Sequence, residues 1–198
     1  MRTKICRGLA YSAAAALSAA PLHAGSIGGT ATVDGSAAVG GVVALEGAPE
    51  KPAPSSAPRA VMDQKNLAFV PALLPVVAGT TVEFTNSDHV QHNVFSPSEV
   101  GGKFNLGTYG PGAARSVTFS KPGEVLVLCN IHMEMEARIL VLKDPYFSPV
   151  GTDGRFEIRD VPAGTYALRL WRGGWLSFRR TVEVSEIGAL TVEVVAEP

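Results

Sequence analysis

The sequence predicts an all-β protein that contains more than one β-sandwich. Helical periodicity is nearly absent, and short runs rich in valine, phenylalanine, threonine and leucine alternate with glycine, proline, asparagine and aspartate. Runs of this kind, bounded by turn-forming residues, are typical of antiparallel sandwiches. A proline-rich stretch and a later turn-rich stretch separate the runs into groups, which indicates two modules.

The first 24 residues have the features of a signal peptide. Three basic residues come before an alanine- and leucine-rich stretch from Leu9 to Ala20, and Ala24 ends a small-residue cleavage site. The apolar stretch is too short and too rich in alanine for a membrane span, although an uncleaved anchor is the alternative. We therefore expect residues 1–24 to be removed from a protein of the periplasm, whose mature chain has no membrane span.

Removal of the leader leaves a single cysteine. The chain has two cysteines, and Cys6 lies in the expected leader. One cysteine in an exported protein cannot form an internal disulfide, so Cys129 is either a small buried apolar side chain or a chemically active one. The formal net charge of −1 over the full chain gives no reason to expect a nucleic-acid partner.

Four segments in the middle of the chain have the patterns of strands. Residues 80–85 and 115–119 alternate apolar and polar side chains, as a strand does when one of its faces is buried. Residues 124–129 are more continuously apolar and end in Cys129, and residues 137–142 follow after a short loop. We expect this loop to join two strands that are buried in a sandwich.

Two changes of composition mark the limits of the modules. Residues 48–59 contain four prolines among alanine, serine and charged residues, so we expect an extended, semi-rigid linker there. A second boundary lies at Lys143-Asp144-Pro145, and residues 144–198 beyond it contain turns and further strand patterns. Residues 60–143 and 144–198 are therefore expected to be separate modules.

A short segment of the central module has the spacing of a metal site. Cys129, His132 and Met135 follow one another at intervals of three residues, and His92 lies upstream in another loop. A thiolate and two imidazoles in a trigonal set, with a distant thioether, suit copper as both Cu(I) and Cu(II). These residue types indicate a mononuclear copper site that transfers single electrons.

Three alternatives stay open at this site. Met133 directly follows His132, and its thioether competes with that of Met135 for the axial position. His89 lies three residues before His92, either as a solvated loop histidine or as part of a second metal site. Zinc also accepts cysteine and histidine ligands, so the residue types alone do not fix the metal.

Several segments of the central module share the pattern of a known family. They are Asn66-Leu67-Ala68-Phe69-Val70-Pro71, Ala78-Gly79-Thr80-Thr81-Val82-Glu83-Phe84-Thr85-Asn86, His92-Asn93-Val94, Pro122-Gly123-Glu124 and Cys129-x-x-His132-x-x-Met135. On these segments, residues 60–143 resemble a cupredoxin domain of the plastocyanin and amicyanin kind. The chain as a whole is similar to periplasmic proteins often labelled methylamine utilization proteins.

The resemblance implies a Greek-key β-sandwich with one type 1, or blue, copper ion. It implies that His92, Cys129 and His132 are the equatorial ligands and that Met135 is the axial one. It also implies that Asn93 ties the two ligand loops together, and that His132 is the electron port. Phe95, Met133 and Pro111 are candidates for the rim of this port.

The C-terminal module, residues 144–198, resembles a carboxypeptidase regulatory-like, or transthyretin-like, β-sandwich. Such domains begin with a strand, a glycine-containing turn and a second strand, which this segment lacks. Residues 28–35 and 39–45 have that shape. We therefore expect the N-terminal strands in residues 25–47 to complete the second, smaller sandwich; the alternative is that they add an edge strand to the cupredoxin domain.

A cluster of arginines in the C-terminal module has two interpretations. It is either a docking face for an acidic redox partner or an ordinary solvated strand face beside partly buried tryptophans, and strand alternation favours the second. The residues concerned are Arg169, Arg172, Arg179, Arg180, Trp171 and Trp175.

The function expected from the sequence is that of a periplasmic blue copper protein that passes single electrons between redox partners, such as a c-type cytochrome or a periplasmic dehydrogenase. We expect no enzyme, because the leader-free chain has only three histidines, too few for an additional catalytic copper. The alternatives are a non-redox protein that stores, delivers or senses copper, and a metal-free cupredoxin-like interaction module.

Overall fold

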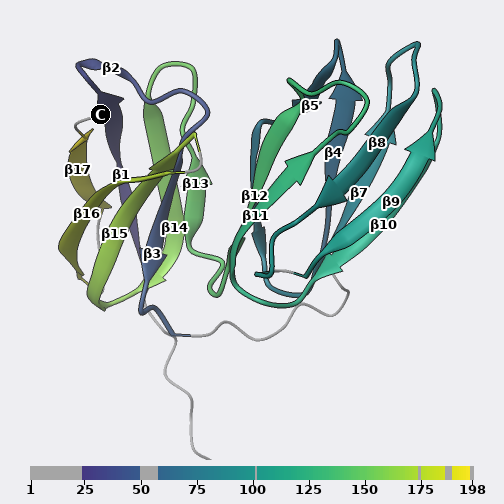
Figure 1. The fold of residues 1–198 in the computed structure, drawn as a ribbon. Helices are drawn as coiled ribbons and strands as arrows, with labels where there is room; N and C mark the ends of the chain where they lie inside the picture. The colour runs from purple at the N-terminus through teal and green to yellow at the C-terminus, as the bar shows by residue number, and fades with distance from the viewer. Residues whose placement is uncertain (1–23, 50–57, 101, 174, 186–188, 197–198) are drawn as a thin grey trace, which may run out of the picture.

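The structure is a computed structural model of the 198-residue chain, and it describes residues 24–49, 58–100, 102–173, 175–185 and 189–196. The expected leader, up to residue 23, and residues 50–57 of the expected linker lie outside this part. All regular elements in the described ranges are strands, which confirms the all-β class. The same ranges contain no helix long and apolar enough to cross a membrane. Two β-sandwiches stand side by side (Figure 1).

The central sandwich consists of two facing sheets. One has the order β10-β7-β4-β5, with β10 (Ala114–Phe119), β7 (Thr80–Asn86), β4 (Arg59–Lys65) and β5 (Ala68–Val70). The other has the order β6-β12-β11-β8-β9, with β6 (Leu73–Val77), β12 (Glu136–Leu142), β11 (Gly123–Leu128), β8 (His92–Ser96) and β9 (Phe104–Tyr109). The β4–β7 and β6–β12 pairs are parallel and the other pairs are antiparallel.

Alternating side chains build the core between these two sheets. Val82 and Phe84 of β7 are fully buried and pack in one cluster with Val125 and Val127 of β11. The alternation expected for residues 80–85 is therefore present in β7. In β10 the burial is weaker, and only Phe119 is buried. The reason is that β10 lies at the edge of its sheet.

The second sandwich combines strands from both ends of the chain. One sheet has the order β14-β1-β17, with β2 (Ser36–Ala37) paired to β1, and contains β14 (Arg155–Pro162), β1 (Ala24–Val33) and β17 (Ala189–Ala196). The facing sheet has the order β13-β3-β15-β16, with β13 (Phe147–Pro149), β3 (Val42–Glu46), β15 (Gly164–Arg172) and β16 (Trp175–Val184). Both β1 and β3 thus pair with strands of the C-terminal segment, and neither pairs with a strand of the central sandwich.

A glycine allows the parallel pairing of β1 with β17. A Cβ atom at Gly29 would lie 1.8 Å from the carbonyl oxygen of Val192, which no side chain could accept. The glycine-rich start of β1 therefore serves the close approach of two backbones.

An apolar patch joins the two sandwiches. Each sandwich has its own buried core. A third cluster contains residues of both: Val42, Ala44 and Trp171 from the second sandwich, and Leu73, Leu140 and Leu142 from the central one. The outer faces of β3 and β15 thus pack on the outer faces of β6 and β12. This contact lies on the side of the central sandwich and leaves the end that carries the β11–β12 loop free (Figure 1).

Candidate metal centre

The candidate ligands lie on two loops at one end of the central sandwich. His92 is the first residue of β8, and Cys129 directly follows the end of β11. The antiparallel pairs bring these two ends together, because Leu128 pairs with both Phe95 of β8 and Glu136 of β12. His132 and Met135 lie in the short loop between β11 and β12.

Backbone hydrogen bonds close this loop around its side chains. The N–H of Cys129 donates to the carbonyl oxygen of Met135 at 3.3 Å, and the N–H of Met135 donates to that of His132 at 3.0 Å. A tight loop of this kind restricts the positions of the three candidate ligands that it carries. Of these three, Cys129 and His132 have donor atoms close to that of His92.

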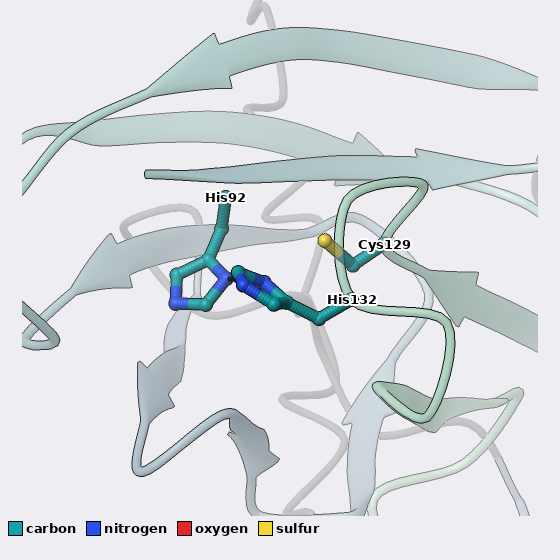
Figure 2. Close-up of side chains that lie close together, drawn as sticks. All are labelled: His92, Cys129 and His132. Atoms are coloured by element: carbon teal, nitrogen blue, oxygen red, sulfur yellow. Dashed lines mark hydrogen bonds between the residues drawn. The ribbon is translucent and has the colours of Figure 1, made fainter. Parts of the chain in front are cut away.

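Three of the four candidate ligands form a compact group (Figure 2). One imidazole nitrogen of His92, one of His132 and the sulfur of Cys129 all lie within 4.8 Å of one another. The two Nδ1 atoms are 3.1 Å apart, and the ring planes meet at 63°. Metal–ligand bonds of about 2.0 to 2.3 Å place trigonal ligands about 3.5 Å apart. The donor atoms therefore fit one metal ion after only small shifts.

Burial differs between the candidate ligands. His92 is fully buried, Cys129 and Met135 are buried in the core of the central sandwich, and His132 is half-buried. In contrast, Met133 is 78% exposed. His89 is exposed and lies outside the three-residue group. The site thus has a buried side formed by His92 and a solvent side formed by His132.

Asp88 holds the imidazole of His92 from the side opposite to the cysteine. Its Oδ2 atom lies 2.8 Å from Nε2 of His92. A backbone hydrogen bond from Leu67 is the main cause that lowers the pKa of Asp88, so the carboxylate is ionised at neutral pH. An ionised carboxylate only accepts hydrogen bonds, so the network assigns the ring proton to Nε2. The lone pair of Nδ1 is then available to a metal.

The sequence alone did not single out Asp88. Its signal in the sequence is a carboxylate four residues before a candidate ligand histidine, within the turn that follows β7. Aspartate is common in turns, because its side chain can accept a hydrogen bond from a nearby backbone N–H group of the same turn. Only the distance to Nε2 distinguishes Asp88 from an ordinary turn residue.

Asn93 makes a different contact from the one expected. The resemblance implied that it ties the two ligand loops together, but its Nδ2 atom donates to Oδ1 of Asn105 in β9 at 2.9 Å. The side chain therefore links β8 to β9, its neighbour in the sheet. It still fixes the strand that begins with His92.

Tyr109 and Gln64 form a buried hydrogen-bonded pair next to the start of β8. Tyr109 pairs with His92 across β8 and β9, and its phenol accepts a hydrogen bond from Nε2 of Gln64 at 2.8 Å. The phenol donates to the carbonyl oxygen of Phe84 at 3.1 Å. Burial raises the pKa of Tyr109 to about 12, so the phenol stays neutral and remains a donor at neutral pH. Neither residue was singled out by the sequence, because a buried polar pair has no local pattern.

Exposed apolar side chains gather in the loops at this end of the sandwich. Ile131 and Met133 flank His132 and are 45% and 78% exposed, and Val90 precedes His92 by two residues and is 44% exposed. Of the three residues expected at the rim, Met133 and Pro111 are exposed, whereas Phe95 is half-buried beside Leu128. Val90 and Ile131 were not among the residues expected at this rim from the sequence.

Comparison with known proteins agrees with this geometry. Residues 58–142, which include all four candidate ligands, match the sequence model of a family described as copper binding proteins, plastocyanin/azurin family. This match supports a cupredoxin domain in the central sandwich. The donor set and the family agree on copper as its cofactor. No curated protein sequence matches the chain.

Three solved structures with local similarity each cover half of the chain or less. A purple cupredoxin from Nitrosopumilus maritimus is 24% identical over 42% of this chain and 99% of its own, with a TM-score of 0.38. A copper-containing nitrite reductase from Thermus scotoductus SA-01 is 28% identical over 48% of this chain, with a TM-score of 0.41, and only 24% of that enzyme is covered. A mutant of amicyanin in its reduced state is 23% identical over 50% of this chain and 98% of its own, with a TM-score of 0.41.

Proposed function

We propose that this chain is a type 1 copper protein that accepts and donates single electrons. His92, Cys129 and His132 are the equatorial ligands in this proposal, and Met135 is the axial one. The observation that carries it is the group of three donor atoms, one nitrogen from each of two imidazoles and the sulfur of a thiol at 3% exposure, which lie within 4.8 Å of one another. Copper bound there supplies a one-electron couple, and the soft sulfur and the imidazoles suit both of its oxidation states.

The protein contributes a rigid frame to this chemistry. His92 is held by Asp88 and by the β8–β9 pair, and the loop with Cys129 is closed by its own backbone bonds. Ligands fixed in this way move little when an electron arrives or leaves. A carrier needs this property more than it needs tight binding of either state.

The axial position tests the assignment of Met135. Its burial at 1% beside Cys129 in the same core cluster supports it as the axial ligand over Met133, which is 78% exposed. We expect Met135→Leu to raise the reduction potential by about 60 mV, which corresponds to a tenfold change in the relative affinity for the two copper states. Met133→Leu serves as the matched control. Cyclic voltammetry of both variants decides the point, and a shift in Met133→Leu alone would reverse the assignment.

His132 is the proposed port for electrons. It is the half-buried ligand, and the exposed side chains of Ile131 and Met133 flank it. An apolar rim around a ligand edge suits brief docking, because it needs no charge pairing that would slow release. The proposed partners are redox proteins of the periplasm, such as a c-type cytochrome or a dehydrogenase, and the proposed role is transport of electrons without catalysis.

The proposed domain division follows the two cores. Residues 60–143 form the cupredoxin domain, and residues 25–47 together with 144–198 form a carboxypeptidase regulatory-like sandwich. The pairing of β1 with β14 and β17, and of β3 with β13 and β15, supports this division. The cupredoxin domain is then an insertion between two parts of the second sandwich, which is tolerated where the ends of a loop lie close together.

Copper loading tests the proposed function. The full chain, purified and supplied with Cu(II), is expected to develop an intense visible absorption from sulfur to copper and to lose and regain it on reduction and reoxidation. Electron paramagnetic resonance should show one copper per chain. Binding of Cu(I) without this absorption would instead indicate storage or delivery. A preference for zinc, or no metal uptake at all, would contradict the proposal.

A further inference from the structure

We propose that Asp88 is a positioning residue that fixes the His92 ring and its ring proton, and that it is itself fixed by the turn between β4 and β5. The inference rests on the proposed function for its electrochemical consequences. Its structural part concerns residues of this chain alone. It goes beyond the ligand set, because it connects the metal centre to a turn more than twenty residues away.

The turn between β4 and β5 offers two N–H groups to one carboxylate. The N–H of Asn66 donates to Oδ1 of Asp88 at 2.6 Å, and that of Leu67 donates to Oδ2 at 3.0 Å. Both residues have positive φ angles, 55° and 58°. Successive N–H groups in a turn can form a concave site for an anion. The Asp88 carboxylate occupies this site.

The hydrogen bond between Leu67 and Asp88 has to offset backbone strain at Leu67. A leucine at positive φ is strained, and the usual choice at the second position of such a tight turn is glycine. Leu67 is also 52% exposed, so little packing stabilises it there. The N–H of Leu67 donates to the Asp88 carboxylate, and this hydrogen bond stabilises the conformation. Strained backbone that persists in this way is typical of positions with a functional constraint.

Hydrogen bonds within its own loop also hold Asp88 in place. The N–H of Asp88 donates to Oδ1 of Asn86 at 3.0 Å, and Nδ2 of Asn86 donates to the carbonyl oxygens of Val90 and Tyr109 at 2.9 and 3.2 Å. These bonds fix the loop that carries Asp88 between β7 and β8. Both carboxylate oxygens thus have a set direction before any metal binds, and Oδ2 lies 2.8 Å from Nε2 of His92.

Two consequences follow for His92. First, the neutral ring keeps its proton on Nε2, and Nδ1 presents its lone pair toward His132 and Cys129. Secondly, a carboxylate hydrogen bond makes the imidazole a stronger donor to a metal, as outer contacts of this kind do in other sites. A stronger nitrogen donor favours Cu(II) over Cu(I). Asp88 therefore lowers the reduction potential as well as orienting the ring.

The test compares Asp88→Asn with Asp63→Asn in the full chain. Asp63 is the matched control, because its carboxylate also accepts a side-chain hydrogen bond, from Thr85 at 2.7 Å, but contacts none of the candidate ligands. In copper-loaded protein we expect Asp88→Asn to reduce the affinity for Cu(II) relative to Cu(I) about tenfold, which raises the potential by about 59 mV. Asp63→Asn is expected to leave the potential unchanged, and an equal shift in both variants would overturn the proposal.

A second measurement needs no copper. Nitrogen NMR of the metal-free protein at neutral pH reports which ring nitrogen of His92 carries the proton. We expect Nε2 in the wild type and in Asp88→Glu, which keeps the charge, and a mixture of both tautomers in Asp88→Ala, which removes the acceptor. An unchanged tautomer in a folded Asp88→Ala protein would overturn the role of Asp88. If the wild type takes up no copper, the proposed function fails, while this measurement still decides whether Asp88 positions His92.

Discussion

Cys129→Ser is expected to abolish the visible absorption of the copper-loaded protein and its reversible reduction. The sulfur of Cys129 is buried at 3% exposure and lies within 4.8 Å of the donor nitrogens of His92 and His132. A serine hydroxyl does not ionise at neutral pH and is a hard ligand that disfavours Cu(I). Outer-shell changes alone cost 10- to 100-fold in metal affinity, so loss of a ligand should cost more than about 100-fold. Competition with a copper chelator and visible spectroscopy measure both effects.

The control for this variant is Cys6→Ser, at the only other cysteine of the chain. Cys6 lies in the expected leader and outside the described residues, so its substitution is expected to leave the copper spectrum unchanged. The folded state of Cys129→Ser is checked by circular dichroism, because a buried hydroxyl without a partner costs about 1 to 3 kcal/mol. A folded Cys129→Ser protein with an unchanged copper spectrum would refute the proposed ligand set.

The candidate ligands between β11 and β12 could be singled out from the sequence for a local reason. Cys129, His132 and Met135 lie in one short loop, and the apolar run before Cys129 indicated the strand that delivers them. The structure adds the cross-strand pairs that bring His92 to the same end of the sandwich. A pattern along the chain is sufficient where neighbours in sequence are also neighbours in the site.

The support of the site could not be predicted in the same way. Asp88 contacts Asn66 and Leu67, which are 22 and 21 residues away, and Gln64 contacts Tyr109 over 45 residues. These pairs depend on the register of β4, β7 and β9, which no local pattern records. The same limit explains why the side chain of Asn93 was expected to link the two ligand loops, whereas it contacts Asn105. Its direction depends on the neighbouring strand β9 and not on its place after His92.

The contact between the two sandwiches could not be predicted from the sequence either. Trp171 belongs to a strand whose alternation places neighbouring residues in its own core, and the sequence analysis expected the tryptophans to be partly buried there. The structure buries Trp171 against Leu73, Leu140 and Leu142 of the central sandwich instead. Arg169, two residues before Trp171, forms an ion pair with Glu46 at 2.6 Å. Which strand faces become interfaces depends on how the sandwiches pack.

Trp171→Ala is therefore expected to destabilise the protein and to uncouple its two sandwiches. Trp171 is 9% exposed and is the largest side chain of the apolar patch between them. Truncation of a buried tryptophan costs about 3 to 5 kcal/mol. The expected loss is at the lower end, about 3 kcal/mol, because the residue also lines an existing cavity of about 490 Å³ and is not enclosed on all sides.

Calorimetry separates this effect from general destabilisation. With the patch intact, we expect the two cores to unfold in one transition, because neither can lose its structure without exposing the apolar faces of the other. Without the indole ring the coupling across the patch is weakened, so two unfolding transitions should appear. The transition that releases copper is then assigned to the central sandwich. Met133→Ala, at a residue that is 78% exposed, is the control and should leave the transition unchanged within about 0.5 kcal/mol. A single transition at the wild-type temperature in Trp171→Ala would show that Trp171 stabilises neither the protein nor the coupling between the two sandwiches, and would contradict the prediction.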